Sequence, residues 1–377
     1  MPHKPIRVLH IINTLSYGGA EILLREGLRV ADRSEVELHF ASLNDKNDLL
    51  RPDLADLGGT VTCLGLDHPR YFFRAFRRGL AYIRTRDIDI IHAHLPVSGF
   101  MARLLGRVSG RPVLYTEHSL PAAYSRPMQL ISRISWGWQQ YVTAISEDVE
   151  AGIHQRYGNK VPVQVICNSI NTARIAPHPE AGARIRAQYG IPPEARVAGT
   201  IASLRNSPAK RMDVWLQAAQ KIAEKEPSAR FMIVGDGDRR PALEALAASL
   251  GLQDRVVFTG NQADVVPFLN AFDVFLLSSQ YEGFGIVLIE AMACGIPVSA
   301  TQVAGIRNII TPNETGLLAA FDESVAASLA QNTLRLFREP ALARRLSNNG
   351  RQRVEQQYSI QNMQRSFEDI YRKLLHD

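Results

Sequence analysis

Cysteine is scarce in this chain, and long hydrophobic runs are missing. Among 377 residues there are three cysteines, Cys63, Cys167 and Cys294, which lie far apart in apolar segments. Their spacing and odd number exclude a disulfide framework and a cysteine metal motif, so we expect reduced, buried cysteines in a cytoplasmic protein. No apolar run reaches about 18 residues, which predicts no transmembrane helix. The first residues, MPHKPIRVLHIINTL, enter a strand pattern directly and lack a signal-peptide cleavage site.

The excess of positive charge is confined to the first half of the sequence. Residues 1–190 contain 23 Lys+Arg against 17 Asp+Glu, whereas residues 191–377 contain 20 of each, and the whole chain carries +6. A modest basic excess on one domain indicates an anionic partner, such as membrane lipid or a phosphate-bearing acceptor. It is too small to predict nucleic-acid binding.

Strand and helix patterns alternate in two series. The first starts with the apolar run 6–12 and ends with a strand at 163–166, and the second starts at 197–201. Such alternation predicts parallel strands joined by crossover helices, hence an α/β fold with doubly wound sheets. The length of 377 residues suits two domains of ordinary size.

The stretch 172–193 is rich in Ala, Pro and charged residues and is the best candidate for a linker. We therefore expect an N-terminal domain at 1–172 and a C-terminal domain at 173–358. The last residues, 359–377, form an amphipathic helical pattern with one apolar face.

The most informative stretch is 281–298, YEGFGIVLIEAMACGIPV. Glu282 and Glu290 lie eight positions apart, with Gly283 and Gly285 between them. A helical pattern begins near Gly285, and the free N–H groups and dipole at a helix start favour a phosphate. Carboxylates accept hydrogen bonds from sugar hydroxyls. A solvated helix face is the alternative, but the pattern matches the parts of a sugar nucleotide.

Two cations, Arg205 and Lys210, lie five positions apart between a strand end and a helix. Arginine binds a diphosphate bidentately and lysine adds a point charge, although solvated surface charges have the same appearance. Later strands of this half end in glycine turns at Gly235 and at Gly260-Asn261. The tight turn at Gly235 requires its glycines.

The first strand of the chain leads into a glycine turn, Tyr17-Gly18-Gly19-Ala20-Glu21. A strand, a glycine turn and a helix in this order present backbone amides to a phosphate, while an ordinary tight turn is the alternative. Glu21 is expected to cap the helix or to face solvent. His118 follows the strand that ends at Glu117, where open α/β sheets bind ligands; a structural histidine is the alternative.

Two D-x-D pairs have the pattern of a metal site, namely Asp87/Asp89 and Asp236/Asp238. The first pair opens a buried strand and the second forms a glycine turn, so we predict no metal and no cofactor. His92 and His94 end a strand; a structural role is expected for both, and His94 is a weaker candidate than His118 for a ligand contact.

The predicted helix near 71–86 is both amphipathic and strongly basic, and residues 70–86 are the candidate membrane contact. Its apolar stripe comprises Phe72, Phe73, Phe76, Leu80 and Ile83. Six arginines occupy the remainder: Arg70, Arg74, Arg77, Arg78, Arg84 and Arg86. Such a helix suits an anionic membrane surface, and a crossover helix with solvated arginines is the alternative.

The stretch E-G-F-G-x4-E-A-M-A-x-G-x-P-V at 282–298 resembles the donor signature of the family 4 retaining glycosyltransferases. The family's G-R-x4-K appears here with Leu204 in place of the glycine, and its P-N-G-V-D hinge appears as Cys167-Asn168-Ser169-Ile170-Asn171. The resemblance implies the GT-B fold, with two Rossmann-like domains facing each other across a cleft. It also implies that the N-terminal domain selects the acceptor, that the C-terminal domain holds a nucleotide sugar, and that the last helix, 359–377, packs back on the N-terminal domain.

The resemblance further implies retaining, metal-independent transfer of a hexosyl group to a hydroxyl of a saccharide or lipid-linked acceptor. The implied catalytic residues are His118, Arg205, Lys210 and Glu282. The implied donor-binding residues are Gly18, Gly19, Arg205, Lys210, Gly235, Gly260, Asn261, Glu282, Gly283, Phe284, Gly285, Ile286 and Glu290. A cytoplasmic enzyme of polysaccharide or glycolipid synthesis at the inner membrane face is expected. A sugar phosphorylase or epimerase of the same fold and a non-catalytic binding partner are the alternatives.

Overall fold

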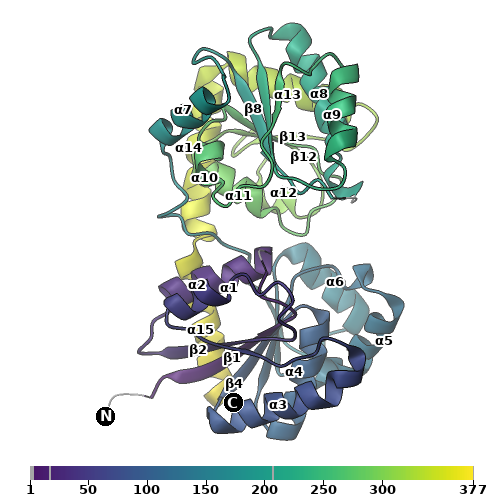
Figure 1. Cartoon of the computed structure of the whole chain (residues 1–377), viewed down its shortest axis with the longest axis vertical. Coiled ribbons are helices and arrows are strands. Elements are labelled where there is room, and N and C mark those ends of the chain that lie inside the picture. Colours follow the sequence, from purple (N-terminus) through teal and green to yellow (C-terminus); the bar gives the residue numbers. More distant parts are fainter. Residues whose placement is uncertain (1–3, 17, 206–207, 377) are drawn as a thin grey trace. The chain divides into compact units, whose positions relative to one another are not determined.

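A computed structural model describes residues 4–16, 18–205 and 208–376. Tyr17, Asn206 and Ser207, which belong to motifs discussed above, lie outside these residues. The chain forms two compact units, one of residues 1–169 with 360–377 and one of residues 170–359 (Figure 1). Residues 170–172 thus belong to the second unit, although the sequence pattern placed them in the first domain.

The first unit is built on a seven-stranded parallel sheet of order β3-β2-β1-β4-β5-β6-β7. Strand order reverses between β1 and β4, which pair with His10 opposite His92. Apolar runs such as IRVLHII in β1 suit this sheet because helices cover both of its faces. The strands are β1 (Ile6–Ile12), β2 (Val36–Ser42), β3 (Thr60–Cys63), β4 (Ile90–His94), β5 (Val113–Glu117), β6 (Tyr141–Ala144) and β7 (Val163–Val165).

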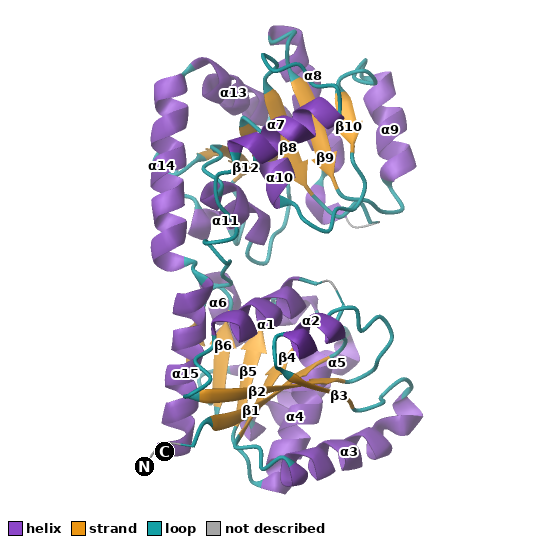
Figure 2. Ribbon diagram, turned by 60° about the vertical axis from the view of Figure 1, so that its left-hand side comes forward, coloured by secondary structure: helices purple, strands orange, loops and turns teal. Residues whose placement is uncertain are grey.

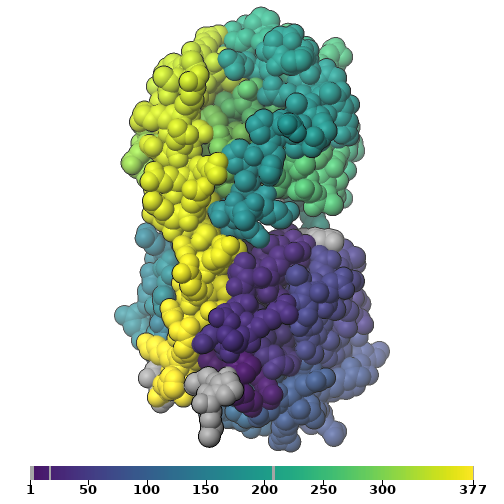
Figure 3. All heavy atoms as spheres, turned by 90° about the vertical axis from the view of Figure 1, so that its left-hand side faces the viewer, coloured from purple at the N-terminus to yellow at the C-terminus, as the bar shows by residue number. Residues whose placement is uncertain are grey.

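Helices cover both faces of this sheet (Figure 2). They are α1 (Gly19–Val30), α2 (Arg51–Asp56), α3 (Phe72–Thr85), α4 (Pro96–Ser109), α5 (Arg126–Ser135), α6 (Glu147–Tyr157) and α15 (Ile360–His376). The C-terminal helix α15 packs against α1, as the yellow and purple atoms of Figure 3 show. Tyr371 of α15 hydrogen-bonds through its hydroxyl to Nδ1 of His92, which ties the end of the chain to β4.

The second unit repeats the same topology in a six-stranded parallel sheet of order β10-β9-β8-β11-β12-β13. Its strands are β8 (Val197–Ile201), β9 (Arg230–Val234), β10 (Val256–Phe258), β11 (Val274–Leu277), β12 (Val298–Thr301) and β13 (Leu317–Ala319). Its helices are α7 (Pro179–Gln188), α8 (Met212–Lys225), α9 (Arg240–Ser249), α10 (Val266–Leu269), α11 (Ile286–Ala293), α12 (Ile306–Ile309), α13 (Val325–Arg338) and α14 (Pro340–Gln357). The predicted α/β class with two doubly wound sheets is confirmed.

Two expectations about side-chain burial are wrong in part. All three cysteines are free, but Cys294 alone of the three is buried, because Cys63 lies in the edge strand β3 and Cys167 in a loop. Phe73 was expected in the apolar stripe of α3, yet 69% of its surface is exposed. The buried positions of α3 are Ala75, Gly79 and Ile83, so Phe73 points away from the core. None of the helices in the described ranges is long and apolar enough to cross a membrane.

Candidate functional site

The second unit places its predicted cations and carboxylates at the point where its strand order reverses. β8 and β11 are neighbours but not consecutive, and the loops after them carry Arg205 and Lys210 on one side and Glu282 on the other. In open α/β sheets the carboxyl ends of strands at this reversal form the usual ligand crevice. The topology therefore explains why residues more than 70 positions apart meet here.

Lys210 and Glu282 form an ion pair, with 2.5 Å between Lys210 Nζ and Glu282 Oε1. Ser279 donates its hydroxyl to the same carboxylate oxygen at 2.8 Å. The Glu282 side chain is 10% exposed, whereas that of Lys210 is 28% exposed, so the pair lies at the rim of the protein surface. The carboxylate is thereby fixed in position and the ammonium group stays within reach of a ligand.

Backbone contacts between the two loops hold Lys210 in place. The hydroxyl of Ser278 donates to the carbonyls of Lys210 and Arg211 at 3.0 and 2.9 Å. The N–H of Gln280 donates to the carbonyl of Ala209 at 2.7 Å. Arg211 adopts φ 43° and ψ 51° just before α8, a left-handed conformation that is uncommon for a residue with a side chain. The surrounding contacts thus maintain a strained turn directly after Lys210.

The helix α11 begins beside Glu282. Gly285 is its N-cap with φ 93°, a conformation that glycine adopts without strain, and Ile286 is its first residue. Gly283 and Phe284 lead into it, and Phe284 is buried against Tyr358, with 5.6 Å between ring centroids. No side chain caps this helix within the described part of the chain. Backbone N–H groups at such a helix start favour an anion, and Glu282 of the ion pair lies just before it in the chain.

Glu290 lies on α11, just over one helical turn after its first residue, Ile286. Its carboxylate makes no hydrogen bond or ion pair with the residues that the structure describes. Burial raises the pKa of Glu290 to about 7, with opposing contributions from the Arg174 charge, which lowers it, and the Asp264 charge, which raises it. Arg174 and Asp264 pair with each other at 3.7 Å. A partly buried carboxylate without a partner is an acceptor that a ligand can satisfy.

Arg205 and Asn261 line a surface hollow of about 590 Å³ together with residues of the β9 turn. Arg205 is exposed, and its side chain has no hydrogen-bond or ion-pair partner in the described ranges. Gly235 and Gly260 meet at the base of this region, where the N–H of Gly235 donates to the carbonyl of Gly260 at 2.9 Å. A Cβ on Gly235 would lie 2.0 Å from the carbonyl oxygen of Ala202, so the close packing of these loops requires glycine.

In the first unit, Gly18 and Gly19 form the N-terminus of α1. The Glu21 side chain is buried and does not face solvent. Its carboxyl group lies at this helix terminus, since a Cβ atom added to Gly18 would lie 2.2 Å from Glu21 Oε2. Burial raises the pKa of Glu21, and its own backbone N–H partly offsets that rise. The solvent-facing alternative for Glu21 is thus wrong, since its carboxyl group occupies the helix start itself.

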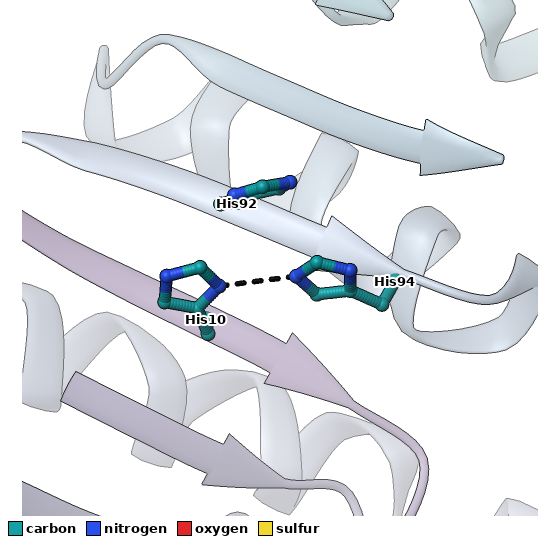
Figure 4. Close-up of side chains that lie close together, drawn as sticks. All are labelled: His10, His92 and His94. Carbon is teal, nitrogen blue, oxygen red and sulfur yellow. Dashed lines mark hydrogen bonds between the residues drawn. The ribbon is translucent and has the colours of Figure 1, made fainter. Parts of the chain in front are cut away.

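His118 follows β5 and forms a hydrogen bond with His94 at the end of β4. Its Nε2 lies 3.2 Å from Nδ1 of His94. Nε2 of His94 in turn lies 3.0 Å from Nδ1 of His10 on β1 (Figure 4). Burial lowers the pKa of His118 to about 4 and that of His10 to about 3. The rings are therefore uncharged near neutral pH.

Three aspartates of the two D-x-D pairs, Asp87, Asp89 and Asp236, contact cationic side chains. Asp87 pairs with Lys4 at 2.7 Å and with Arg7 at 3.3 Å, and Asp89 accepts a hydrogen bond from the N–H of Arg7. In the second pair Asp236 accepts from the N–H of Gly237 at 2.8 Å and pairs with Arg240 at 3.2 Å. Asp236 thus serves as the turn residue that its position predicts.

Two family models match the chain and cover the two units in turn. "Glycosyltransferase Family 4" matches residues 17–174, and "Glycosyl transferases group 1" matches residues 183–353. The putative glycosyltransferase EpsD of Bacillus subtilis (strain 168) is 31% identical over 73% of this chain and 74% of its own length. The N-acetyl-alpha-D-glucosaminyl L-malate synthase of Bacillus anthracis is 27% identical over 96% of both chains.

This chain is a family 4 glycosyltransferase. Solved structures agree with that family at the level of the fold. Anabaena HepE in complex with UDP and glucose has a TM-score of 0.86 at 20% identity, covering 98% of this glycosyltransferase and 100% of that chain. A glycosyltransferase from Rickettsia africae has a TM-score of 0.87 at 21% identity, with 99% of each chain covered. Membership in the family favours glycosyl transfer over the phosphorylase and epimerase alternatives.

Several residues that shape the sites of this glycosyltransferase were given no role by the sequence patterns. Ser278 hydrogen-bonds to the backbone at Lys210, and Ser279 hydrogen-bonds to the Glu282 carboxylate. The sequence signal for both was a pair of hydroxyl residues at the end of an apolar strand. In the first unit Glu117 is buried beside His118 and accepts hydrogen bonds from the hydroxyls of Tyr124 and Tyr115. Burial raises the pKa of Glu117 to about 7. The sequence signal for Glu117 was a glutamate inside a strand predicted to be buried.

Proposed function

We propose that this glycosyltransferase moves a hexosyl group from a nucleotide-diphosphate sugar to a hydroxyl of a saccharide or lipid-linked acceptor, with retention and without a metal ion. The observation that carries the proposal is the Lys210–Glu282 pair beside the uncapped start of α11. A cation and a helix start together bind and stabilise a departing diphosphate. A carboxylate at the same point accepts the hydroxyls of the sugar being transferred.

The remaining site residues have complementary roles in this proposal. Arg205, exposed in its hollow, adds charge for the diphosphate, and Gly235, Gly260 and Asn261 place backbone near the nucleobase. Glu290 accepts the ribose hydroxyls, since its carboxylate has no other partner among the described residues. The UDP and glucose in HepE support a nucleotide sugar and a saccharide as the ligands of this chain.

Retention in this proposal proceeds without a side-chain nucleophile. The bond between the anomeric carbon and the diphosphate oxygen breaks, and the acceptor hydroxyl attacks the same face of the sugar. The departing phosphate oxygen takes the acceptor's proton. Arg205, Lys210 and the start of α11 stabilise the negative charge that develops on the diphosphate. From the first unit, His118 contacts the transferred sugar, and Gly18 and Gly19 contact the donor at the start of α1, where the Glu21 carboxyl group has to move aside.

The proposal is tested by a thermal-shift screen against nucleotide sugars, followed by a transfer assay with each ligand that binds. A ligand at about 100 times its Kd stabilises the folded state by about 2.7 kcal/mol, which is a shift of several degrees in melting temperature. We expect one donor class to shift the melting temperature and Glu282→Gln to abolish transfer from it. A protein that binds donors but transfers no sugar to any hydroxyl acceptor would favour the non-catalytic alternative.

A basic, partly apolar face of the first unit supports a lipid-linked acceptor and a position at the inner face of the membrane. Helices α3, α4 and α5 pack side by side, contain no Asp or Glu, and contain seven arginines besides the buried Arg103. Of the eight large hydrophobic side chains exposed in the described chain, five lie on these helices: Phe73, Val97, Val108, Leu130 and Ile134. Exposed apolar side chains among arginines suit an anionic membrane surface.

Removing two charges from this face is expected to weaken binding to anionic vesicles. On α3, Phe73, Arg77 and Arg84 share one exposed face, whereas Arg74 stacks on Tyr71 and Arg78 contacts a backbone carbonyl. Each arginine near an anionic surface contributes about 1 kcal/mol, so the double variant Arg77→Gln/Arg84→Gln should bind roughly 30-fold more weakly. The measurement is co-sedimentation with phosphatidylglycerol vesicles.

The matched control removes two exposed arginines from the second unit, Arg184→Gln/Arg344→Gln, with the same change in net charge. Vesicles of phosphatidylcholine alone control for apolar adsorption. Equal loss of binding in both double variants would show a response to net charge only and would contradict a docking face on α3.

A further inference from the structure

Three histidines of the first unit form a continuous hydrogen-bonded chain from its interior to the predicted sugar-contacting residue. His10 comes from β1, His94 from the end of β4 and His118 from the residue after β5. The nitrogens of successive rings lie 3.0 Å apart (His10 Nδ1 to His94 Nε2) and 3.2 Å apart (His94 Nδ1 to His118 Nε2). Both nitrogens of His94 are therefore engaged, one with each neighbour.

The cluster of His10, His92 and His94 has the residue types of a metal site, but its hydrogen bonds argue against one. The line between His10 Nδ1 and His94 Nε2 is a direct hydrogen bond, which leaves no room for an ion between these atoms (Figure 4). His92 is engaged at both nitrogens, 2.7 Å from the hydroxyl of Tyr371 and 2.7 Å from that of Thr116. A tetrahedral zinc ion needs lone pairs that converge on one point.

The three hydrogen-bonded histidines have two uncharged arrangements of their protons, and the two differ at His10 and at His118. Each neutral imidazole carries one N–H, so two facing nitrogens must be one donor and one acceptor. If His94 carries its proton on Nε2, then His118 and His10 carry theirs on Nε2 as well. If His94 carries it on Nδ1, the other two rings also switch to Nδ1. Burial keeps all three pKa values below the usual range for histidine, which favours the neutral forms.

The two outer nitrogens of the histidine row can bond to other partners. Neither Nδ1 of His118 nor Nε2 of His10 bonds to a residue within the described ranges. All three rings line a cavity of about 30 Å³ that also touches α1 and α15. A cavity of this size admits about two water molecules, which can act as donor or acceptor towards His10. Both arrangements can therefore be satisfied without a net charge.

We propose that His10 and His94 are positioning residues that couple the tautomer of His118 to theirs, so that the chain presents either an N–H donor or a lone-pair acceptor to a sugar hydroxyl at His118 Nδ1. The contact of His118 with the sugar rests on the proposed function. The coupling of the three rings does not, because it follows from the hydrogen bonds of the ligand-free protein. The same chain would thus serve a hydroxyl that donates and one that accepts.

The test is a long-range ¹H–¹⁵N correlation spectrum of the full-length protein labelled at histidine, recorded at neutral pH without ligand. Ring nitrogen shifts distinguish the Nδ1–H, Nε2–H and charged forms. We expect His10, His94 and His118 to share one tautomer, or to show shifts averaged in the same proportion. Opposite tautomers in bonded rings, a charged ring, or zinc bound in equimolar amount would each overturn the proposal.

The variant His94→Phe breaks the chain at its centre and makes the tautomers of His10 and His118 independent. It should also slow transfer roughly tenfold, as expected for the loss of one hydrogen bond that positions His118. His178→Phe, an exposed histidine of the second unit, is the matched control and should change only its own signal. Unchanged His118 shifts in a folded His94→Phe variant would refute the coupling, whether or not the protein transfers sugar. If His94→Phe does not fold, the wild-type spectrum alone decides.

Discussion

Replacing Lys210 with methionine is expected to lower the rate of transfer by about 10²- to 10³-fold, the effect of removing one preorganised group that stabilises developing charge. Methionine keeps the length of the side chain but removes its ammonium group, which lies beside the helix start of α11. The measurement is kcat with the donor found by thermal shift. Lys221→Met, on the exposed face of α8, is the matched control and should retain full activity.

The ion pair allows catalysis to be separated from folding. Lys210→Met leaves the nearly buried Glu282 carboxylate with Ser279 as its remaining partner among the bonds described, which should cost about 1–3 kcal/mol of unfolding free energy. Adding Glu282→Gln removes the unpaired charge and should restore most of that stability. Transfer should not recover in the double variant. Recovery of transfer together with stability would show that the pair is structural and would contradict the proposed site.

The second large effect concerns Glu290 and pH. Because its pKa is raised to about 7, roughly a tenth of this carboxyl is ionised near pH 6 and nine-tenths near pH 8. The ionised form accepts hydrogen bonds from two ribose hydroxyls, so affinity for a nucleotide sugar should rise roughly tenfold over this interval. A diphosphate esterified at both ends does not titrate there. The measurement is Kd by calorimetry at several pH values.

Glu290→Gln should bind the donor more weakly and without this pH dependence, whereas Glu323→Gln, an exposed carboxyl of the same unit, should behave as wild type. Stability gives a second readout. A carboxyl whose pKa is higher in the folded than in the unfolded state binds more protons when the protein is folded. Its contribution to the free energy of unfolding is therefore present at low pH and is lost as pH rises through about 7. Identical pH profiles of wild type and Glu290→Gln would contradict the role of Glu290 in binding.

The sequence predicted the secondary structure of this protein well because local pattern and burial agree. Continuous apolar runs became strands covered on both faces, as in β1 and β4, and the glycine turns at Gly235, Gly260 and Gly285 adopt the positive φ angles that glycine permits. The burial of individual helix positions was less predictable. Phe73 lies in a run of aromatic residues, but the direction of α3 relative to its sheet, which no local pattern encodes, turns this residue to the surface.

By itself, the sequence determined the class of the fold and the residues that we propose to bind a nucleotide sugar, since strand alternation and the spacing of glycines, carboxylates and cations are local properties. Tertiary structure alone decided which of those residues meet. Lys210 reaches Glu282, 72 positions away, because β8 and β11 are neighbours where the strand order reverses. His10, His94 and His118 line up because β1, β4 and β5 pair in register. Pairing between distant strands fixes such contacts, and a pattern read along the chain contains no distance between them.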